Sequence, residues 1–334
     1  MIISKTPLRC SFFGGGTDFH DYYENSRFGY GSTISTALDM YVYITVNRNF
    51  NNQIRLCYSG NELVNSVDEV KHNIIREALK LVGIESGIEI FYSADIPLSS
   101  AGIGLASSSA LAVGVLNALH AYKGEFVSPE QLAKEACHIE IDCLGQKIGI
   151  QDQYAVAYGG FKRYRFNRDS SVTVMPVICD YENQTKLENN LMLFFTGLTR
   201  DSRKILSEQT QTISEKMAML DGLTETVDRT YESLMAGKID DWGRELDKAW
   251  EVKKKFAGGV SNPLIDEMYS AARRSGALGG KILGAGGGGF LLLYVPEDKQ
   301  ASVRQALAEY REVPFHFEPQ GSHIIFFDGE EKYK

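Results

Sequence analysis

The chain has 334 residues, of which 43% are hydrophobic and 23% charged, and its formal net charge at pH 7 is −8. This length favours two domains, and the acidic balance argues against a nucleic-acid partner. Apolar runs such as Leu191 to Phe195 are too short to cross a membrane, and the N-terminus lacks the apolar stretch of a signal peptide. Five cysteines without a CxxC pair predict reduced thiols and a cytoplasmic protein.

The first motif in the chain is PLRCSFFGGGTDF, from Pro7 to Phe19. A predicted strand over Arg9 to Phe13 runs into three glycines, which are followed by Thr17 and Asp18. An aspartate behind a glycine turn can accept paired hydrogen bonds from vicinal hydroxyls, as a sugar site requires. The same pattern also forms an Asx turn or caps the next segment, so the residues alone leave both interpretations open.

Strands and helices alternate through the rest of the first half. Extended, β-branched and aromatic segments predict strands over 40–48, 53–58, 88–96 and 159–166. Periodic apolar positions predict helices over 67–82, 108–122 and 129–144. A polar passage over 176–185 is the predicted domain boundary.

A glycine and serine loop, PLSSAGIGLASSSALAVG, links the strand over 88–96 to the next helix. Leu111, Val115 and Leu119 recur every four residues, which predicts an amphipathic helix beginning near Ser107 to Ser109. The free N–H groups and the positive dipole end of such a helix favour a phosphate. No lysine follows the glycines, so a phosphate would be held by backbone and hydroxyl groups. The alternative is a serine-capped helix with only a structural role.

Two acidic residues suit phosphoryl transfer. Glu140 lies on the predicted helix over 129–144, and Asp152 follows in the segment GQKIGIQDQYA. That reaction needs a carboxylate ligand for Mg²⁺ and a second carboxylate that orients or deprotonates the attacking hydroxyl. Acidic residues on helices are common, and a glutamate such as Glu140 taken alone is more often a surface residue.

The second half predicts a strand over 191–196 and a long helical region over 202–255, broken near Gly237. A helix over 263–275, two strands around the glycines of KILGAGGGGFLLLYV, a helix over 298–311 and a strand over 322–327 follow. This order predicts an α+β sandwich of ferredoxin-like type.

The run Gly284 to Gly289 formally matches the GxGxxG dinucleotide fingerprint. We reject that interpretation, because the glycines precede an apolar strand and only 45 residues remain. Five glycines between two strands instead predict a backbone that closely approaches a ligand or the opposite domain, with a bulged hairpin as the alternative.

Taken together, PLRCSFFGGGTDF, PLSSAGIGLASSSALAVG, HIEIDCLGQKIGIQDQYA and KILGAGGGGF resemble the motifs of the GHMP kinases. The resemblance implies a two-domain α+β fold. Its N-terminal ATP-binding domain (residues 1–180) would be similar to ribosomal protein S5 domain 2, and its C-terminal domain (181–334) would be ferredoxin-like. Within the family, GGGTDF, IGIQDQYAVAYGGF and FFTGLTRDS are most similar to the branch that phosphorylates the anomeric hydroxyl of a heptose 7-phosphate.

The resemblance also implies roles for individual residues, with ATP and Mg²⁺ as cofactors and a sugar or sugar phosphate as substrate. Asp152 would be the general base and Arg9 would support the nucleophile. Ser108 and Glu140 would bind Mg²⁺. The sugar would lie against Gly15, Gly16, Thr17, Asp18 and Asp152, and ATP would contact Ser99, Ala101, Gly102, Gly104, Ser107, Ser108, Ser109, Gly286 and Gly287.

Two departures from the family pattern matter. Gly15 and Gly16 stand where galactokinase has a glutamate–histidine pair, which leaves more room and makes galactose a poorer candidate. The third serine, Ser109, competes with Ser108 as the metal ligand, although the register favours Ser108.

Other functions remain open at this stage. They are another sugar 1-kinase acting on fucose, galactose or a uronic acid, a non-catalytic sugar- and ATP-binding regulator, and an ATP-dependent decarboxylase. An anionic ligand would need a local cationic site, and the candidate clusters are Lys5 with Arg9, the run KRYRFNR over 162–168, and Arg200 with Arg203 and Lys204. For a substrate phosphate, the candidates are Arg200 and Arg203 or the run over 162–168. The sequence indicates no oligomeric state.

Overall fold

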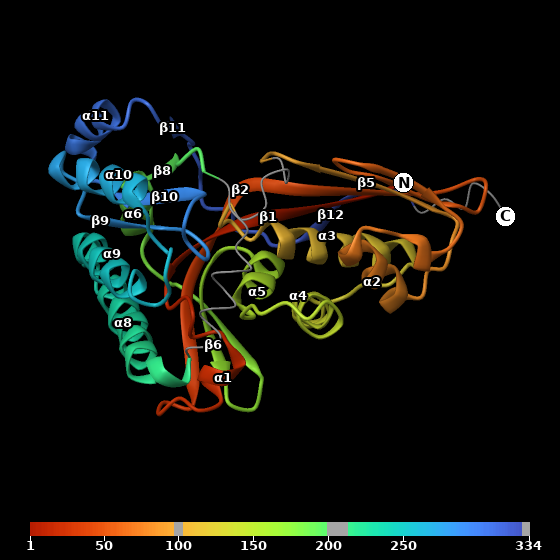
Figure 1. The fold of residues 1–334 in the computed structure, drawn as a ribbon, viewed down its shortest axis with the longest axis horizontal. Helices are drawn as coiled ribbons and strands as arrows, with labels where there is room; N and C mark the ends of the chain where they lie inside the picture. The colour runs from red at the N-terminus through yellow and green to blue at the C-terminus, as the bar shows by residue number, and fades with distance from the viewer. Residues whose placement is uncertain (97–102, 199–212, 329–334) are drawn as a thin grey trace.

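The computed structural model describes residues 1–96, 103–198 and 213–328. Figure 1 shows two sheets, one formed mainly by the first half of the chain and one by the second. The first sheet has the strand order β12 (His323–Phe327), β1 (Ile2–Phe13), β2 (Tyr30–Arg48), β5 (Ile88–Ala94), β3 (Ile54–Cys57) and β4 (Asn61–Val64). A side branch starts at β2, which also pairs with β6 (Phe161–Asn167), and β6 pairs with β7 (Val172–Pro176). Its strands pair antiparallel, apart from the parallel pair β3–β5.

Helices from the first half of the chain cover one face of this sheet (Figure 1). They are α2 (Asn73–Val82), α3 (Ser107–Tyr122), α4 (Pro129–Cys137) and α5 (Gln151–Tyr158), with the short helices α1 (His20–Tyr23) and η1 (Val67–Glu69) at the margins. The predicted helix over 129–144 is not uniform, because α4 gives way to the π-helix η2 (His138–Cys143). That change of pitch places Glu140 in the interior.

The helix α3 differs from the amphipathic helix that its apolar spacing predicts. Nearly all of its residues are buried, because it lies between the sheet and the other helices. Gly114 allows this position, since a Cβ atom there would lie 2.9 Å from the Thr6 hydroxyl oxygen. Ser4 on the same strand donates a hydrogen bond to the Gly114 carbonyl. The fold therefore fixes the start of α3, and with it the serines, against β1.

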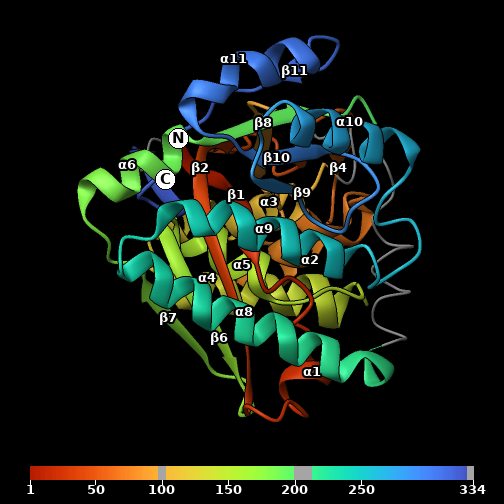
Figure 2. The same ribbon diagram turned by 90° about the vertical axis from the view of Figure 1, so that its left-hand side faces the viewer.

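The second sheet has the order β11 (Arg311–Glu312), β8 (Leu191–Phe195), β10 (Phe290–Tyr294) and β9 (Gly279–Ile282). The helices α6 (Tyr181–Asn189), α9 (Ile239–Lys253) and α10 (Pro263–Arg274) pack on this sheet, and α11 (Glu297–Ala306) packs on α10. The short helix η3 (Ser214–Lys216) leads into α8 (Met217–Met235), which packs on β2 and α9. Figure 2 shows α8 and α9 side by side in front of the first sheet. Gly237 has φ +74° and separates them, which confirms the predicted break.

Aromatic packing joins the two halves. Trp242 of α9 meets the rings of Phe12 and Phe13 of β1 edge-on, with centroids 5.2 Å and 4.8 Å apart. The chain then returns to its beginning, since β12 pairs with β1 rather than with the second sheet where the sequence order placed it. Exposed strand edges favour pairing, and β1 offers one. The boundary at residue 180 stays a prediction.

The two-layer α+β architecture agrees with the predicted fold class. None of the helices in the described segments combines the length and the apolar composition that a membrane span requires. All five cysteines are unpaired.

Candidate active site

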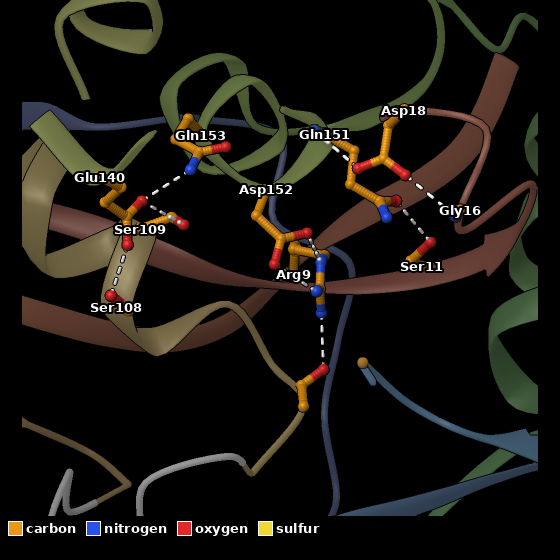
Figure 3. A network of polar contacts seen from close by, with 12 residues as sticks. Arg9, Ser11, Gly16, Asp18, Ser108, Ser109, Glu140, Gln151, Asp152 and Gln153 are labelled. Carbon is orange, nitrogen blue, oxygen red and sulfur yellow. Dashed lines mark hydrogen bonds and ion pairs between the residues drawn. The ribbon is translucent and has the colours of Figure 1, made fainter. Parts of the chain in front are cut away.

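The centre of the candidate site is an ion pair between β1 and α5, drawn in Figure 3. Arg9 Nε donates to Asp152 Oδ1 at 2.9 Å, and Nη2 donates to Oδ2 at 2.7 Å. The third nitrogen, Nη1, donates to the Gly104 carbonyl at 2.6 Å. Arg9 is buried, whereas the Asp152 side chain keeps 27% of its surface exposed. The carboxylate is therefore held in a fixed direction by a planar cation and still faces open space.

A second cluster surrounds Glu140, which is completely buried. Ser108 Oγ donates to Oε1, while Ser109 Oγ (2.8 Å) and Gln153 Nε2 (2.6 Å) donate to Oε2 (Figure 3). Burial raises the pKa of Glu140, and the hydrogen bonds from these three donors oppose that shift. The sequence predicted Ser108 and Glu140 here. It did not predict Gln153, and the structure brings Ser109 as close as Ser108.

This donor set fits a magnesium ion. Mg²⁺ prefers hard oxygen ligands and is usually held by one or two carboxylates together with substrate phosphates. Two more buried oxygens, Ser107 Oγ and Gln153 Oε1, lack a hydrogen-bond partner among the described residues. Within the described segments, no group of three or more His, Cys, Asp or Glu residues could hold a metal. An ion beside Glu140 would therefore rely on hydroxyl and phosphate oxygens as well.

Asp18 connects the N-terminal glycine turn to the start of α5. Its carboxylate accepts the backbone N–H groups of Gly16 (3.0 Å) and Gln151 (3.2 Å). A Cβ atom on Gly149 would lie only 1.9 Å from this carboxylate, so that position requires glycine. Burial, with repulsion from Asp152, raises the pKa of Asp18 to about 6. Asp18, the predicted sugar contact, thus also holds the start of the helix that carries Asp152.

The glycine turn itself differs from residue to residue. Gly15 has space around it, because a Cβ atom there would lie 3.7 Å from its nearest neighbour, the side-chain nitrogen Nε2 of Gln151. Gly16 (φ +101°) instead packs against the ring of Phe256. Thr17 is fully buried, and its hydroxyl is used on the backbone of Gly14 and Ser32. The structure therefore leaves Gly15 as the accessible part of the turn.

The two glycine motifs of the chain meet directly. A Cβ on Gly284 would lie 2.5 Å from Gly104 Cα, and one on Gly289 would lie 2.3 Å from the Ile103 carbonyl oxygen. The Gly287 N–H donates to the Val260 carbonyl, and Gly286 packs on the same residue. The glycine run thus lets one half of the chain approach the other closely, as predicted. Of the predicted ATP contacts, Ser99, Ala101 and Gly102 lie outside the described residues.

Several of the predicted cations have structural partners. Arg163 pairs with Asp228, Arg168 donates to the Glu24 and Ser26 carbonyls, and Lys5 lies over the Tyr41 ring. Arg200, Arg203 and Lys204 lie outside the described residues. The structure instead brings Lys253 and Lys281 of the second half toward Arg9, a proximity for which the sequence carried no signal.

Both halves of the chain match known family models. Residues 69–160 match the model of the GHMP kinases N terminal domain, and residues 230–312 match that of the GHMP kinases C terminal. A D-glycero-alpha-D-manno-heptose 7-phosphate kinase of Campylobacter jejuni is 27% identical over 92% of this chain and 93% of the relative. A mevalonate kinase of Pyrococcus horikoshii is 30% identical over 70% of this chain and 68% of the relative.

A solved structure is similar over almost the full length. The crystal structure of a D-glycero-D-manno-heptose 1-phosphate kinase from Bacteroides thetaiotaomicron superposes with a TM-score of 0.80 at 25% identity, covering 98% of this chain and all of that one. Sequence and structure thus point to the same group of relatives.

Proposed function

Because the chain belongs to the GHMP kinase family and is an ATP-dependent phosphotransferase, we propose that it transfers the γ-phosphoryl group of ATP to the anomeric hydroxyl of D-glycero-D-manno-heptose 7-phosphate. The products would be the 1,7-bisphosphate and ADP. The observation that carries this proposal is the Arg9–Asp152 pair, which fixes a partly exposed carboxylate beside the open glycine turn. The heptose kinase of Campylobacter jejuni supports the choice of acceptor.

The proposed reaction assigns the proton to Asp152. The anomeric hydroxyl gives its proton to the carboxylate as its oxygen forms a bond to the γ-phosphorus, and the bond from that phosphorus to the β–γ bridging oxygen breaks. A positioned base of this kind contributes about 10²–10⁴-fold to the rate. Arg9 holds the carboxylate toward the sugar and balances negative charge beside the attacking oxygen.

Magnesium would be held by Glu140 and Ser108, with Ser109 as the neighbouring hydroxyl, and would supply positive charge to the phosphates. Gly104 and the N-terminus of α3, with Ser107 to Ser109, would lie along the nucleotide phosphates. Gly15 would face the sugar, and the buried Asp18 would hold the turn in place through the backbone N–H groups of Gly16 and Gln151. We also propose a cytoplasmic location, which fits five unpaired cysteines.

A second candidate is a 1-kinase for a sugar without a phosphate, such as fucose or galactose. One observation favours it. The cationic run over 162–168, a predicted phosphate site, has Arg163 and Arg168 engaged by other parts of the protein. Those two side chains are therefore poorly placed to bind a substrate phosphate.

The experiment that separates the candidates is acceptor-dependent release of ADP from Mg-ATP over a panel of free and phosphorylated hexoses and heptoses. Preference for D-glycero-D-manno-heptose 7-phosphate supports the first proposal. Preference for an unphosphorylated sugar supports the second. ATP binding without any acceptor-dependent ADP release contradicts both.

A further inference from the structure

Lys253 occupies the last turn of α9, at the junction of the two halves. Its Nζ atom donates to the carbonyl of Ile282 at 2.9 Å and to that of Gly284 at 2.5 Å. Both carbonyls lie at the entrance to the glycine run, and the packing of Trp242 on Phe12 and Phe13 holds α9 against β1. The amine is thus fixed by two uncharged acceptors, and an ammonium group has three N–H donors.

The charges facing Lys253 are predominantly positive. Arg9 of β1, Asp152 of α5 and Lys281 of β9 all interact electrostatically with it. Arg9 is compensated by its ion pair with Asp152, whereas Lys281 donates to an uncharged acceptor, the Phe12 carbonyl, at 2.8 Å. Burial and repulsion by Lys281 and Arg9 hold the pKa of Lys253 well below its usual range. A lowered pKa favours the neutral amine, whereas an anion bound beside Lys253 would favour the protonated form.

The backbone links Arg9 and Lys253 at the point where the two halves of the chain meet. Gly104 accepts a hydrogen bond from Arg9, and Gly284 accepts one from Lys253. These two glycines are in direct contact, because a Cβ on Gly284 would lie 2.5 Å from Gly104 Cα. Arg9 and Lys253 therefore approach the same junction from opposite halves of the chain.

We propose that Lys253 is a second cationic contact for the phosphoryl group that ATP transfers, opposite Arg9 across the Gly104–Gly284 junction. This inference rests on the proposed phosphoryl transfer, but not on which sugar accepts the group. It predicts that Lys253 distinguishes a nucleotide with a γ-phosphate from one without.

The test compares binding of the non-hydrolysable analogue adenylyl imidodiphosphate with binding of ADP, both with Mg²⁺, by calorimetry on the full chain. Lys253→Met should lower the preference for the triphosphate by about 10–100-fold, the range expected for a hydrogen bond to a charged group. Lys253→Arg should restore most of that preference. The matched control is Lys254→Met, since Lys254 pairs with Glu251 instead. Equal loss of affinity for both nucleotides, or no loss for either, would overturn the inference.

A second measurement covers the case in which Lys253→Met does not fold. In the unmodified protein, the preference for the triphosphate should fall as the pH rises, because Lys253 loses its proton. In Lys253→Arg the guanidinium stays charged, so the profile should flatten although Lys281 is still present. The inference would be overturned if the nucleotide preference depended on pH in the same way in Lys253→Arg and in the unmodified protein. Neither of these binding measurements needs turnover. If no acceptor stimulated ADP release, the proposed function would be contradicted, but the role of Lys253 in nucleotide binding could still be tested.

Discussion

Arg9 donates to both carboxylate oxygens of Asp152, at 2.9 Å and 2.7 Å, and its remaining nitrogen donates to the Gly104 carbonyl at 2.6 Å. One side chain thus links the candidate base to a glycine of the candidate ATP loop. Gly104 in turn touches Gly284 of the second half. The direction of the Asp152 carboxylate consequently depends on how the two halves of the chain meet.

Asp152→Asn should lower the rate of acceptor-dependent ADP release by about 10²–10⁴-fold, because the amide does not accept the hydroxyl proton. Affinity for ATP should stay nearly unchanged, since the substitution removes no donor to the phosphates. Steady-state kinetics with nucleotide-binding measurements checks both parts. Asp142→Asn, an exposed residue paired with His138, is the control. Normal turnover in Asp152→Asn would refute the base assignment.

Glu140→Gln should raise the Mg²⁺ concentration needed for half-maximal activity at least about tenfold, because a neutral amide is a weaker ligand for a hard cation. Ser108→Ala and Ser109→Ala form a matched pair, since their hydroxyls donate to different oxygens of the same carboxylate. We expect the larger shift in the Mg²⁺ titration for Ser108→Ala. A larger shift for Ser109→Ala would reassign the ligand, and an unchanged titration in Glu140→Gln would refute the site.

Asp18 predicts a dependence of stability on pH. Its pKa is raised to about 6 in the folded protein from an ordinary value of 3.8. The unfolded chain therefore releases this proton first as the pH rises. Relative to Asp18→Asn, the native protein should lose about 2 kcal/mol of unfolding free energy between pH 4 and pH 7. Urea denaturation of both proteins across this range measures the difference. A constant difference would show that Asp18 is not a buried acid.

Gly284→Ala tests the contact between the glycine motifs. The matched control is Gly83→Ala, because Gly83 has a similar φ (+72° against +66°) but no atom within 4 Å of its added Cβ. Gly83→Ala should lower the free energy of unfolding by about 1 kcal/mol through backbone strain alone. Gly284→Ala should lower the free energy of unfolding by about 1–3 kcal/mol more, because its Cβ clashes with Gly104, and its turnover should fall as well. Equal losses of unfolding free energy would show that the junction tolerates a side chain.

Local patterns in the sequence predicted much of this fold. Apolar periodicity located most helices and strands, and glycine spacing indicated where the halves approach each other. Three features depended on long-range packing instead. In the π-helix at His138–Cys143, Glu140 turns inward and accepts hydrogen bonds from Ser108 and Ser109 of α3. The strand β12 pairs with β1, at the opposite end of the chain. Lys253 lies within electrostatic reach of Arg9 because α9, with Trp242, packs on β1.

The central claim is that this chain places phosphate on the anomeric oxygen of a heptose 7-phosphate. The most direct measurement is ³¹P nuclear magnetic resonance of the product formed from Mg-ATP and D-glycero-D-manno-heptose 7-phosphate, with Asp152→Asn in parallel. We expect one new phosphomonoester signal, coupled to the anomeric proton and equal in amount to the ADP released. Asp152→Asn should form this product far more slowly. A phosphate on another carbon, or ADP release without a new sugar phosphate, would contradict it.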